Sequence, residues 1–237
     1  MGKRIIAQAR GKGGSNYRAP SFRYKGDARH RKLTDDVSYG MVVDLIKCQG
    51  HSSPLAMVEY DDEEISLMIA PEGIKVGDMV TAGSAEGGPG SLAKLQDLPD
   101  GALVYNIEGK PGDGGKFCRS AGTYAKVVSK TGNTVIVQLP SKRKKAFHET
   151  CRANMGVISG GGRLEKPLLK AGKNHFKHRA KNKIYPKVSG ASMNAVDHPF
   201  GNKRSSRKSN ARVAPRNAPP GRKVGMVRAK RTGRRKK

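Results

Sequence analysis

The segment 193–201, MNAVDHPFG, places Asp197 directly before His198, and both residue types serve in proton transfer. A carboxylate can orient an imidazole as a general base, which then activates a nucleophile. The hydroxyls of Ser189 and Ser192 match no known triad spacing. The residues therefore favour contact with a base or a ribose, and a catalytic role for His198 stays open as the alternative.

Two glycine-rich segments are candidate phosphate-binding loops. Residues 111–116 read PGDGGK, and residues 160–163 read GGGR directly after a predicted strand. Backbone N–H groups of such loops can cradle a phosphate. The sequence lacks the G-x-x-x-x-G-K-[ST] pattern of nucleotide hydrolases, so these glycines indicate close approach of an RNA backbone instead.

The densest group of carboxylates lies between two predicted strands, at Glu59, Asp61, Asp62, Glu63 and Glu64. Paired carboxylates can perform acid–base chemistry or bind a metal ion. A contiguous run at a hairpin turn is more typical of a solvated turn, which is the interpretation that we favour.

The three cysteines, Cys48, Cys118 and Cys151, are widely spaced and odd in number. No C-x-x-C pair is present, so the sequence predicts free thiols in a reducing compartment and no zinc site. We expect no cofactor and no protein-held metal, with Mg²⁺ present only as ions associated with RNA.

Charge is distributed very unevenly along the 237 residues, whose net charge is +28. Residues 1–33 carry a net charge of +9, residues 34–139 carry −7, and residues 140–237 carry +26. Such basic flanks repel themselves and need a polyanion, and nucleic acid is the natural one. Binding of this kind is expected to weaken steeply with salt.

Membrane binding is the other option for a polycation. It requires an amphipathic basic helix with bulky apolar residues, whereas the basic segments here contain Gly, Pro, Ser and Asn. No apolar run approaches the roughly 20 residues that span a bilayer. The start, MGKRIIAQ, also lacks the apolar stretch of a secretory signal. We therefore expect no membrane partner.

The middle of the chain predicts an all-β fold, because short β-branched runs alternate with Gly, Pro, Ser and Asp clusters. A first group of strands is expected at residues 37–48, 55–60, 64–69 and 76–81. A second group of five strands is expected at residues 102–107, 123–129 and 134–139, directly after a basic loop at 141–151, and at 155–159, with a hairpin turn at 130–133. Each group fits a small barrel, and we expect the two barrels to pack together because each buries little core by itself.

The flanks show no helical periodicity. Residues 1–33 are predicted as an extended arm, in which Tyr17, Phe22 and Tyr24 either stack on bases or dock on the protein's own core. Residues 160–237 are predicted to be disordered alone and to fold against RNA.

Several stretches together resemble the universal L-two family of large-subunit ribosomal proteins, in its archaeal/eukaryotic form, over essentially the whole chain. They are FRYKGDARHRK (22–32), LAMVEY (55–60), IAPEGIKVGD (69–78), PGDGGKFCRSAG (111–122), GVISGGGRLEKPLLKAG (156–172), ASMNAVDHPFG (191–201) and RNAPPGRKVG (216–225).

The resemblance implies an oligonucleotide-binding (OB) barrel followed by an SH3-like barrel. The expected organisation is a basic N-terminal arm at 1–36, the OB-like barrel at 37–83, the SH3-like barrel at 84–165 and a basic tail at 166–237. The family is a primary binder of large-subunit rRNA that supports subunit association, tRNA binding and the architecture around the peptidyl transferase centre. It is not expected to be an enzyme.

The partners implied are large-subunit rRNA, small-subunit rRNA at an intersubunit bridge, neighbouring ribosomal proteins and, indirectly, tRNA, in the cytoplasmic large subunit. The expected rRNA-binding residues are Arg18, Arg23, Tyr24, Arg29, Arg31, Lys116, Arg119, Arg163, Lys170, Lys173, His175, Lys177, Asn194, His198, Lys203, Arg204, Arg212, Arg216, Arg222 and Lys223.

The sequence departs from the family pattern at three places. Asn202 to Ser205 replace a longer glycine run, which removes glycine and adds two cations. Tyr185 stands where Trp is frequent, and Ser189 stands where Arg is common.

Overall fold

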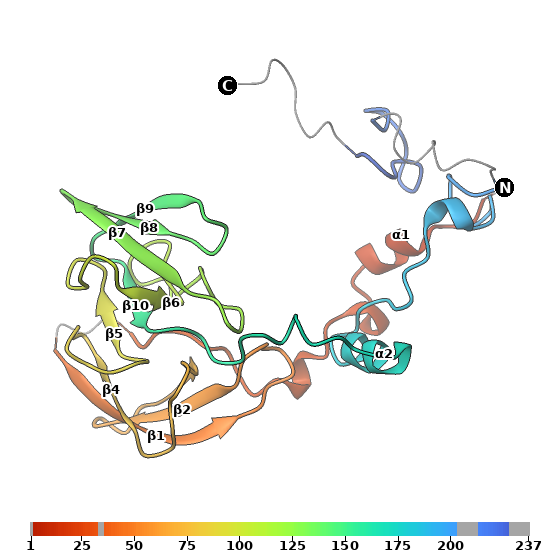
Figure 1. Cartoon of the computed structure of the whole chain (residues 1–237). Coiled ribbons are helices and arrows are strands. Elements are labelled where there is room, and N and C mark those ends of the chain that lie inside the picture. The colour runs from red at the N-terminus through yellow and green to blue at the C-terminus, as the bar shows by residue number, and fades with distance from the viewer. Residues whose placement is uncertain (1, 33–35, 203–212, 228–237) are drawn as a thin grey trace. The chain divides into compact units, whose positions relative to one another are not determined.

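A computed structural model describes residues 2–32, 36–202 and 213–227 (Figure 1). Within these residues the chain forms two compact units. One lies within residues 21–167 and contains the strands, and the other is built from the first 20 residues together with the part of the chain after residue 167. Residues 21–32, predicted as part of the arm, thus belong to the strand unit.

The strand unit contains one mixed sheet of ten strands among the residues that are described. Their bounds are β1 Ser38–Ile46, β2 Leu55–Tyr60, β3 Ile65–Ile69, β4 Met79–Ala82, β5 Leu92–Lys94, β6 Leu103–Tyr105, β7 Ala125–Thr131, β8 Thr134–Gln138, β9 Lys144–His148 and β10 Arg152–Met155. The order across the sheet is β3-β2-β1-β4-β5-β10-β6-β7-β8-β9, and only β4 and β5 pair in parallel. The predicted all-β class, an OB-type barrel followed by an SH3-like barrel, is confirmed.

The first barrel is built around β1, which pairs with β2 on one side and β4 on the other. Its inner face buries Val42, Val58 and Val80, all almost fully removed from solvent. Gly40 is required on β1, because a Cβ there would lie 2.8 Å from the ring of Tyr60 and 2.6 Å from the Val58 side chain. Glycine at this position therefore lets the Tyr60 ring lie across the strand.

The second barrel contains the antiparallel meander β6-β7-β8-β9, and β10 closes onto β6 and β5. The predicted hairpin turn is confirmed: Thr131 pairs with Thr134 across a tight turn, where Gly132 has a φ of 52°. Its core includes the rings of Phe117 and Phe147, which meet edge to face with centroids 5.2 Å apart.

A third apolar cluster joins the two barrels, as expected. Leu55 and Ile69 from the first barrel pack with Tyr105 and Ile158 from the second, and Ala28 of the N-terminal segment completes the cluster. The hydroxyl of Tyr105 donates a 2.9 Å hydrogen bond to the carbonyl oxygen of Ile69. Burial raises the pKa of Tyr105, which keeps this hydroxyl protonated and able to donate.

Four points of the strand prediction need correction. β4 begins at Met79 and not near residue 76, because Lys75 and Asp78 close a turn in which the Lys75 N–H donates to the Asp78 carboxylate at 2.7 Å. The last strand is β10, which ends where Gly156 has a φ of 106°, and not a strand at 155–159. Part of the predicted basic loop is strand β9, and β5 was not predicted.

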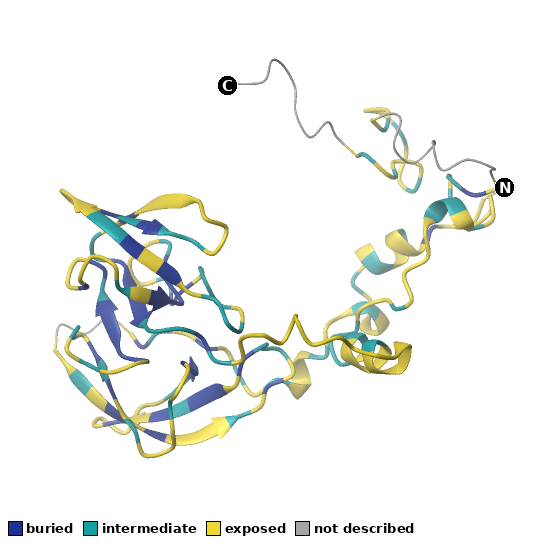
Figure 2. Cartoon of the chain, viewed as in Figure 1, coloured by how far each residue is buried: buried dark blue, intermediate teal, exposed yellow. Residues whose placement is uncertain are grey.

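The prediction of extended flanks is also wrong in part, because both contain short helices. These are α1 Ile6–Gly11, the 3₁₀ turns η1 Ser15–Tyr17 and η2 Ser21–Arg23, α2 Ala171–Arg179, and η3 Gly190–Ser192. None of the nine residues of α2 is buried (Figure 2). A helix without a core-facing side has no apolar periodicity, so the sequence gives no sign of it. Among the described residues, no helix combines the length and apolar character needed to cross a membrane.

Replacing Tyr105 by Phe should lower the free energy of unfolding by about 1–2 kcal/mol, because the Ile69 carbonyl would lose its donor while staying buried. Thermal or denaturant unfolding of the full chain measures this change. Tyr39→Phe is the matched control: Tyr39 is half exposed, and its change should stay within about 0.5 kcal/mol. Equal effects of the two substitutions would contradict a stabilising link between the barrels.

Candidate nucleic-acid interface

The segment 22–32 docks on the glycine-rich loop 109–119 through backbone contacts. The His30 N–H donates to the Gly114 carbonyl at 3.1 Å, and the Arg119 guanidinium donates to the Ala28 carbonyl at 2.5 Å. Ala28 is fully buried beneath this contact. The exposed side chain of Arg29 is thereby held over Gly114, where a Cβ would lie 3.5 Å from it.

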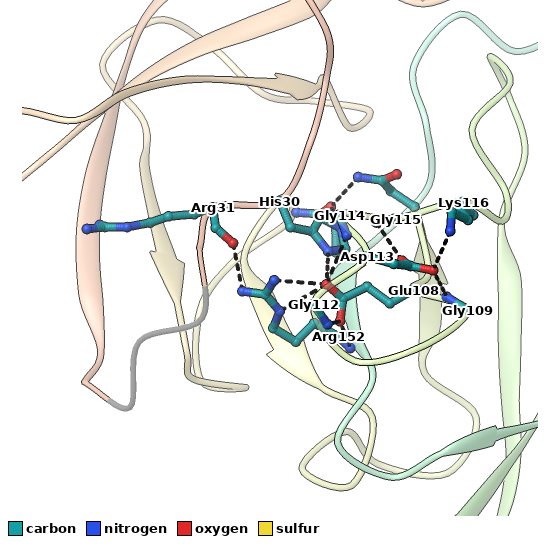
Figure 3. Close-up of polar contacts among 12 residues, drawn as sticks. His30, Arg31, Glu108, Gly109, Gly112, Asp113, Gly114, Gly115, Lys116 and Arg152 are labelled. Carbon is teal, nitrogen blue, oxygen red and sulfur yellow. Dashed lines mark hydrogen bonds and ion pairs between the residues drawn. The ribbon is translucent and has the colours of Figure 1, made fainter.

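A buried carboxylate, that of Glu108, organises the loop (Figure 3). The Arg152 guanidinium on β10 donates to Oε1 at 2.8 and 3.2 Å, and the Arg152 backbone N–H donates to Oε2 at 2.9 Å. The N–H groups of Gly112 and Gly114 point at the same carboxylate, at 3.3 and 3.4 Å. Burial alone would raise the pKa of Glu108, but hydrogen bonds from His30 and Arg152 together lower it to about 2.

His30 completes this network from the N-terminal side. Its Nδ1 lies 3.3 Å from the Glu108 carboxylate, and its Nε2 lies 3.1 Å from the Asn154 side-chain oxygen. Burial lowers the pKa of His30, and this outweighs the opposing effect of Glu108. A neutral imidazole has one N–H, so His30 donates to only one of these two acceptors.

The loop itself is wound around a second carboxylate. Asp113 accepts the N–H groups of Gly109, Lys110 and Gly115 at 3.0 to 3.2 Å and pairs with Lys116 at 3.2 Å. The loop's amide groups are thus directed at the protein's own carboxylates. These amide groups are therefore engaged within the protein and do not form an open phosphate cradle.

Glycine is nonetheless required in this loop. Gly115 has a φ of 90°, and a Cβ there would lie 2.4 Å from the Asn106 side chain. The other glycine-rich loop differs, because residues 161–163 are exposed. It follows an irregular segment, since the last strand has already ended at Met155.

Arg31, predicted to contact rRNA, is instead engaged inside the protein. Its guanidinium pairs with Asp62 and with Glu64, the latter at 3.1 Å, and lies 4.6 Å from the centroid of the Tyr60 ring. Its residue exposure is only 8%. The acidic turn is therefore more than a solvated hairpin, because two of its carboxylates hold the N-terminal segment on the first barrel.

The aromatic residues of the N-terminal segment divide between the two interpretations. Tyr24 packs against the cluster that joins the barrels, so it docks on the protein's own core. Phe22 is 81% exposed, with the guanidinium of Arg23 5.2 Å from its ring centroid, and is available for stacking. In the same way, the guanidinium of Arg10 lies 5.4 Å from the centroid of the Tyr17 ring.

The remaining predicted contacts separate by exposure. In the strand unit, Arg23, Arg29, Lys116 and Arg163 are exposed, and Arg119 is half-buried. The other unit exposes Arg18, Lys170, Lys173, His175, Lys177, Asn194, Arg216, Arg222 and Lys223. Lys203, Arg204 and Arg212 lie outside the described residues. Of the predicted residues, Arg29, Lys116 and Arg119 thus lie at the glycine-rich loop. Most of the others are exposed elsewhere in the described parts of the chain.

His198 is fixed by the backbone of its own segment. Its Nδ1 accepts the Phe200 N–H at 3.0 Å, while the N–H groups of Asp197 and His198 both donate to the Asn194 carbonyl. The imidazole lies against Gly190, where a Cβ would be 2.3 Å from the ring. In an Asp–His pair the His198 Nδ1 would donate to the Asp197 carboxylate, but here Nδ1 accepts the Phe200 N–H instead. The Asp197 residue itself is exposed.

Comparison with known proteins identifies the family. Residues 88–219 match the family described as ribosomal proteins L2, C-terminal domain. Proteins named large ribosomal subunit protein uL2 match nearly full length: that of Archaeoglobus fulgidus is 47% identical over 98% of this chain and 99% of the relative. The protein of Haloarcula marismortui is 48% identical over 99% of this chain and 98% of the relative. The protein of Methanocaldococcus jannaschii is 46% identical over 100% of both chains. The chain belongs to the ribosomal protein L2 family.

Membership in the L2 family confirms the resemblance read from the sequence, including its archaeal/eukaryotic form. The relatives are named as ribosomal proteins and not as enzymes, in agreement with the prediction for this chain. What sequence reasoning missed was the network of His30, Glu108 and Arg152. Its only sign in the sequence was a lone carboxylate at the end of the apolar run LVYNIE.

Replacing Glu108 by Gln should lower the free energy of unfolding by about 3–5 kcal/mol, because the buried Arg152 would lose its counter-charge. The carboxylate's pKa lies below its unfolded value of 4.5, so its contribution is complete above pH 4.5 and is lost as pH falls toward 2. Unfolding at a series of pH values should therefore show a loss in this window that the variant lacks. Asp27→Asn, at an exposed ion pair with Arg29, is the matched control. Identical pH profiles for wild type and Glu108→Gln would refute the assignment.

Proposed function

We propose that this chain is a primary binder of the large-subunit rRNA in the cytoplasmic large ribosomal subunit. One observation carries the proposal: α2 is a helix of nine residues, none buried, whose last turn contains Lys177, His178 and Arg179. Isolated helices this short are marginal in water. An rRNA surface supplies both the counter-charge and the packing that the helix lacks within the chain.

The charge distribution supports the same proposal. The net charge of +26 carried by residues 140–237 is far beyond what a solvated surface of a small domain needs, which is of order 2–8. Arginine supplies a planar fork for phosphates and also stacks on bases, so the exposed arginines are the best candidates for direct contacts. Among the predicted contacts in the strand unit, the exposed arginines are Arg23, Arg29 and Arg163.

The finer roles follow from the family and remain part of the proposal. They are support of subunit association through small-subunit rRNA at a bridge, indirect support of tRNA binding, and maintenance of the architecture around the peptidyl transferase centre. Neighbouring ribosomal proteins complete the partners. We propose that no cofactor is needed and that Mg²⁺ takes part as ions bound to rRNA.

Sedimentation through a gradient at about 0.5 M salt tests rRNA binding, because the Debye length there is only a few Å and loosely bound polycations are released. The full chain should stay with the large subunit, and a chain lacking residues 174–237 should not be incorporated stably. A full chain that runs free or with DNA would overturn the proposal. Normal incorporation of the truncated chain would show that the tail does not carry the affinity.

Replacing His198 by Ala separates scaffolding from catalysis. A scaffold predicts a small change in the rate of peptide bond formation by reconstituted ribosomes, whereas a general base predicts a loss of about 10²-fold or more. Single-turnover kinetics measures the chemical step. Asn194→Ala, which leaves the carbonyl that accepts the His198 N–H in place, controls for local disturbance.

A further inference from the structure

The outer face of the first barrel presents a row of exposed side chains across four strands, and three of them are apolar. The sheet register pairs Met79 on β4 with Met41 on β1, Met41 with Glu59 on β2, and Glu59 with Ile65 on β3. Directly paired residues place their side chains on the same face of a sheet. Met79, Met41 and Ile65 are 56%, 46% and 61% exposed, respectively.

The exposed face extends along β1 toward the start of that strand. Tyr39, two residues before Met41 and therefore on the same face, is 51% exposed. The opposite face of these strands is the one that buries Val42, Val58 and Val80. The barrel's own core therefore does not account for the outer apolar side chains. Scattered exposed apolar residues are ordinary, but adjacent ones on one face of a sheet mark an interaction surface.

The charge around this face excludes RNA as its occupant. Residues 36–82 contain nine acidic residues and only two lysines, in a chain that is otherwise strongly basic. Glu59 lies within the row itself, and the exposed Asp61 lies beside it, its carboxylate accepting the Tyr39 N–H at 3.1 Å. The outer strand face of OB folds often binds oligonucleotides. Here carboxylates on that face would repel phosphates.

We propose that the face formed by Tyr39, Met41, Glu59, Ile65 and Met79 docks a basic segment of another protein in the same particle. Tyrosine and methionine are enriched at the centres of protein interfaces, and a partner with lysine or arginine beside apolar side chains would complement both features of the face. The proposal rests on the proposed function, because it places the partner within the large subunit. It adds a division of surfaces: the flanks bind RNA and this sheet face binds protein.

Photo-cross-linking of large subunits tests the proposal. A benzoylphenylalanine at position 41 of the full chain, with position 79 as a second attachment site, should cross-link after purification to a peptide rich in Lys or Arg from a different protein. Position 124 is the matched control, because Tyr124 is 47% exposed on the second barrel, outside the acidic region. Cross-links from 41 and 79 to rRNA, to a second copy of this chain, or no more than the background seen without irradiation would overturn the proposal.

Charge substitution in the same particles tests the chemistry of the partner. Glu59→Lys should lower the cross-link yield from position 41 by about tenfold, and Glu59→Gln should lower it less, because only the first adds repulsion. Equal yields in all three particles would show that the partner is not recognised by charge and would overturn the basic character assigned to it.

Sedimentation of the same preparations distinguishes the two proposals. Incorporation of the labelled chain without a protein cross-link would overturn only the proposal of a docking surface. Failure of the unlabelled chain to enter the large subunit would overturn the proposed function itself.

Discussion

The fold depends on the removal of one carboxylate from water. Burying a charged carboxylate such as that of Glu108 costs several kcal/mol unless the carboxylate is fully paired. Each hydrogen bond to it therefore stabilises the fold only when the other donors are also in place. These donors come from three separate parts of the chain: the N-terminal segment through His30, the glycine loop through its amides, and β10 through Arg152. The Arg152 guanidinium also donates to the Arg31 carbonyl at 2.9 Å. The docking of the N-terminal segment and the closure of the second barrel are thus one cooperative event.

The parts of this structure that could be predicted are those in which neighbouring residues carry the information. Alternating apolar runs located most strands, and the turn at Gly132 followed from local conformational preference. The network around Glu108 could not be predicted, because its partners lie 44 and 78 residues away in the sequence. The partners of Arg31 could not be predicted for the same reason: a basic residue in a basic segment gives no sign of the acidic turn that it contacts. α2 was missed because its order does not come from a core within the chain.

Opposite charges within this chain serve different purposes in different places. Some acids of the middle region neutralise cations of the protein itself, as Asp62 and Glu64 do for Arg31. Others, such as Glu59, remain exposed on a sheet face that a nucleic acid would avoid. The free thiols belong to the apolar interior: Cys48 and Cys151 are buried, and burial raises the pKa of Cys118 to about 11, which keeps it unreactive. The strand unit therefore combines an inert interior with a surface divided by charge.

Gly40 shows how a residue without functional groups comes to limit the variation of residues that have them. Its missing side chain leaves room for the Tyr60 ring, and that ring in turn supports the guanidinium of Arg31. Any larger residue at position 40 would displace the Tyr60 ring and disturb the Arg31 side chain that lies against it. The backbone carbonyl of Arg31 in turn accepts a hydrogen bond from Arg152 of the buried network. Substitutions in this part of the sequence are therefore coupled: a side chain at position 40 would move the Tyr60 ring, and with it the surface against which Arg31 lies.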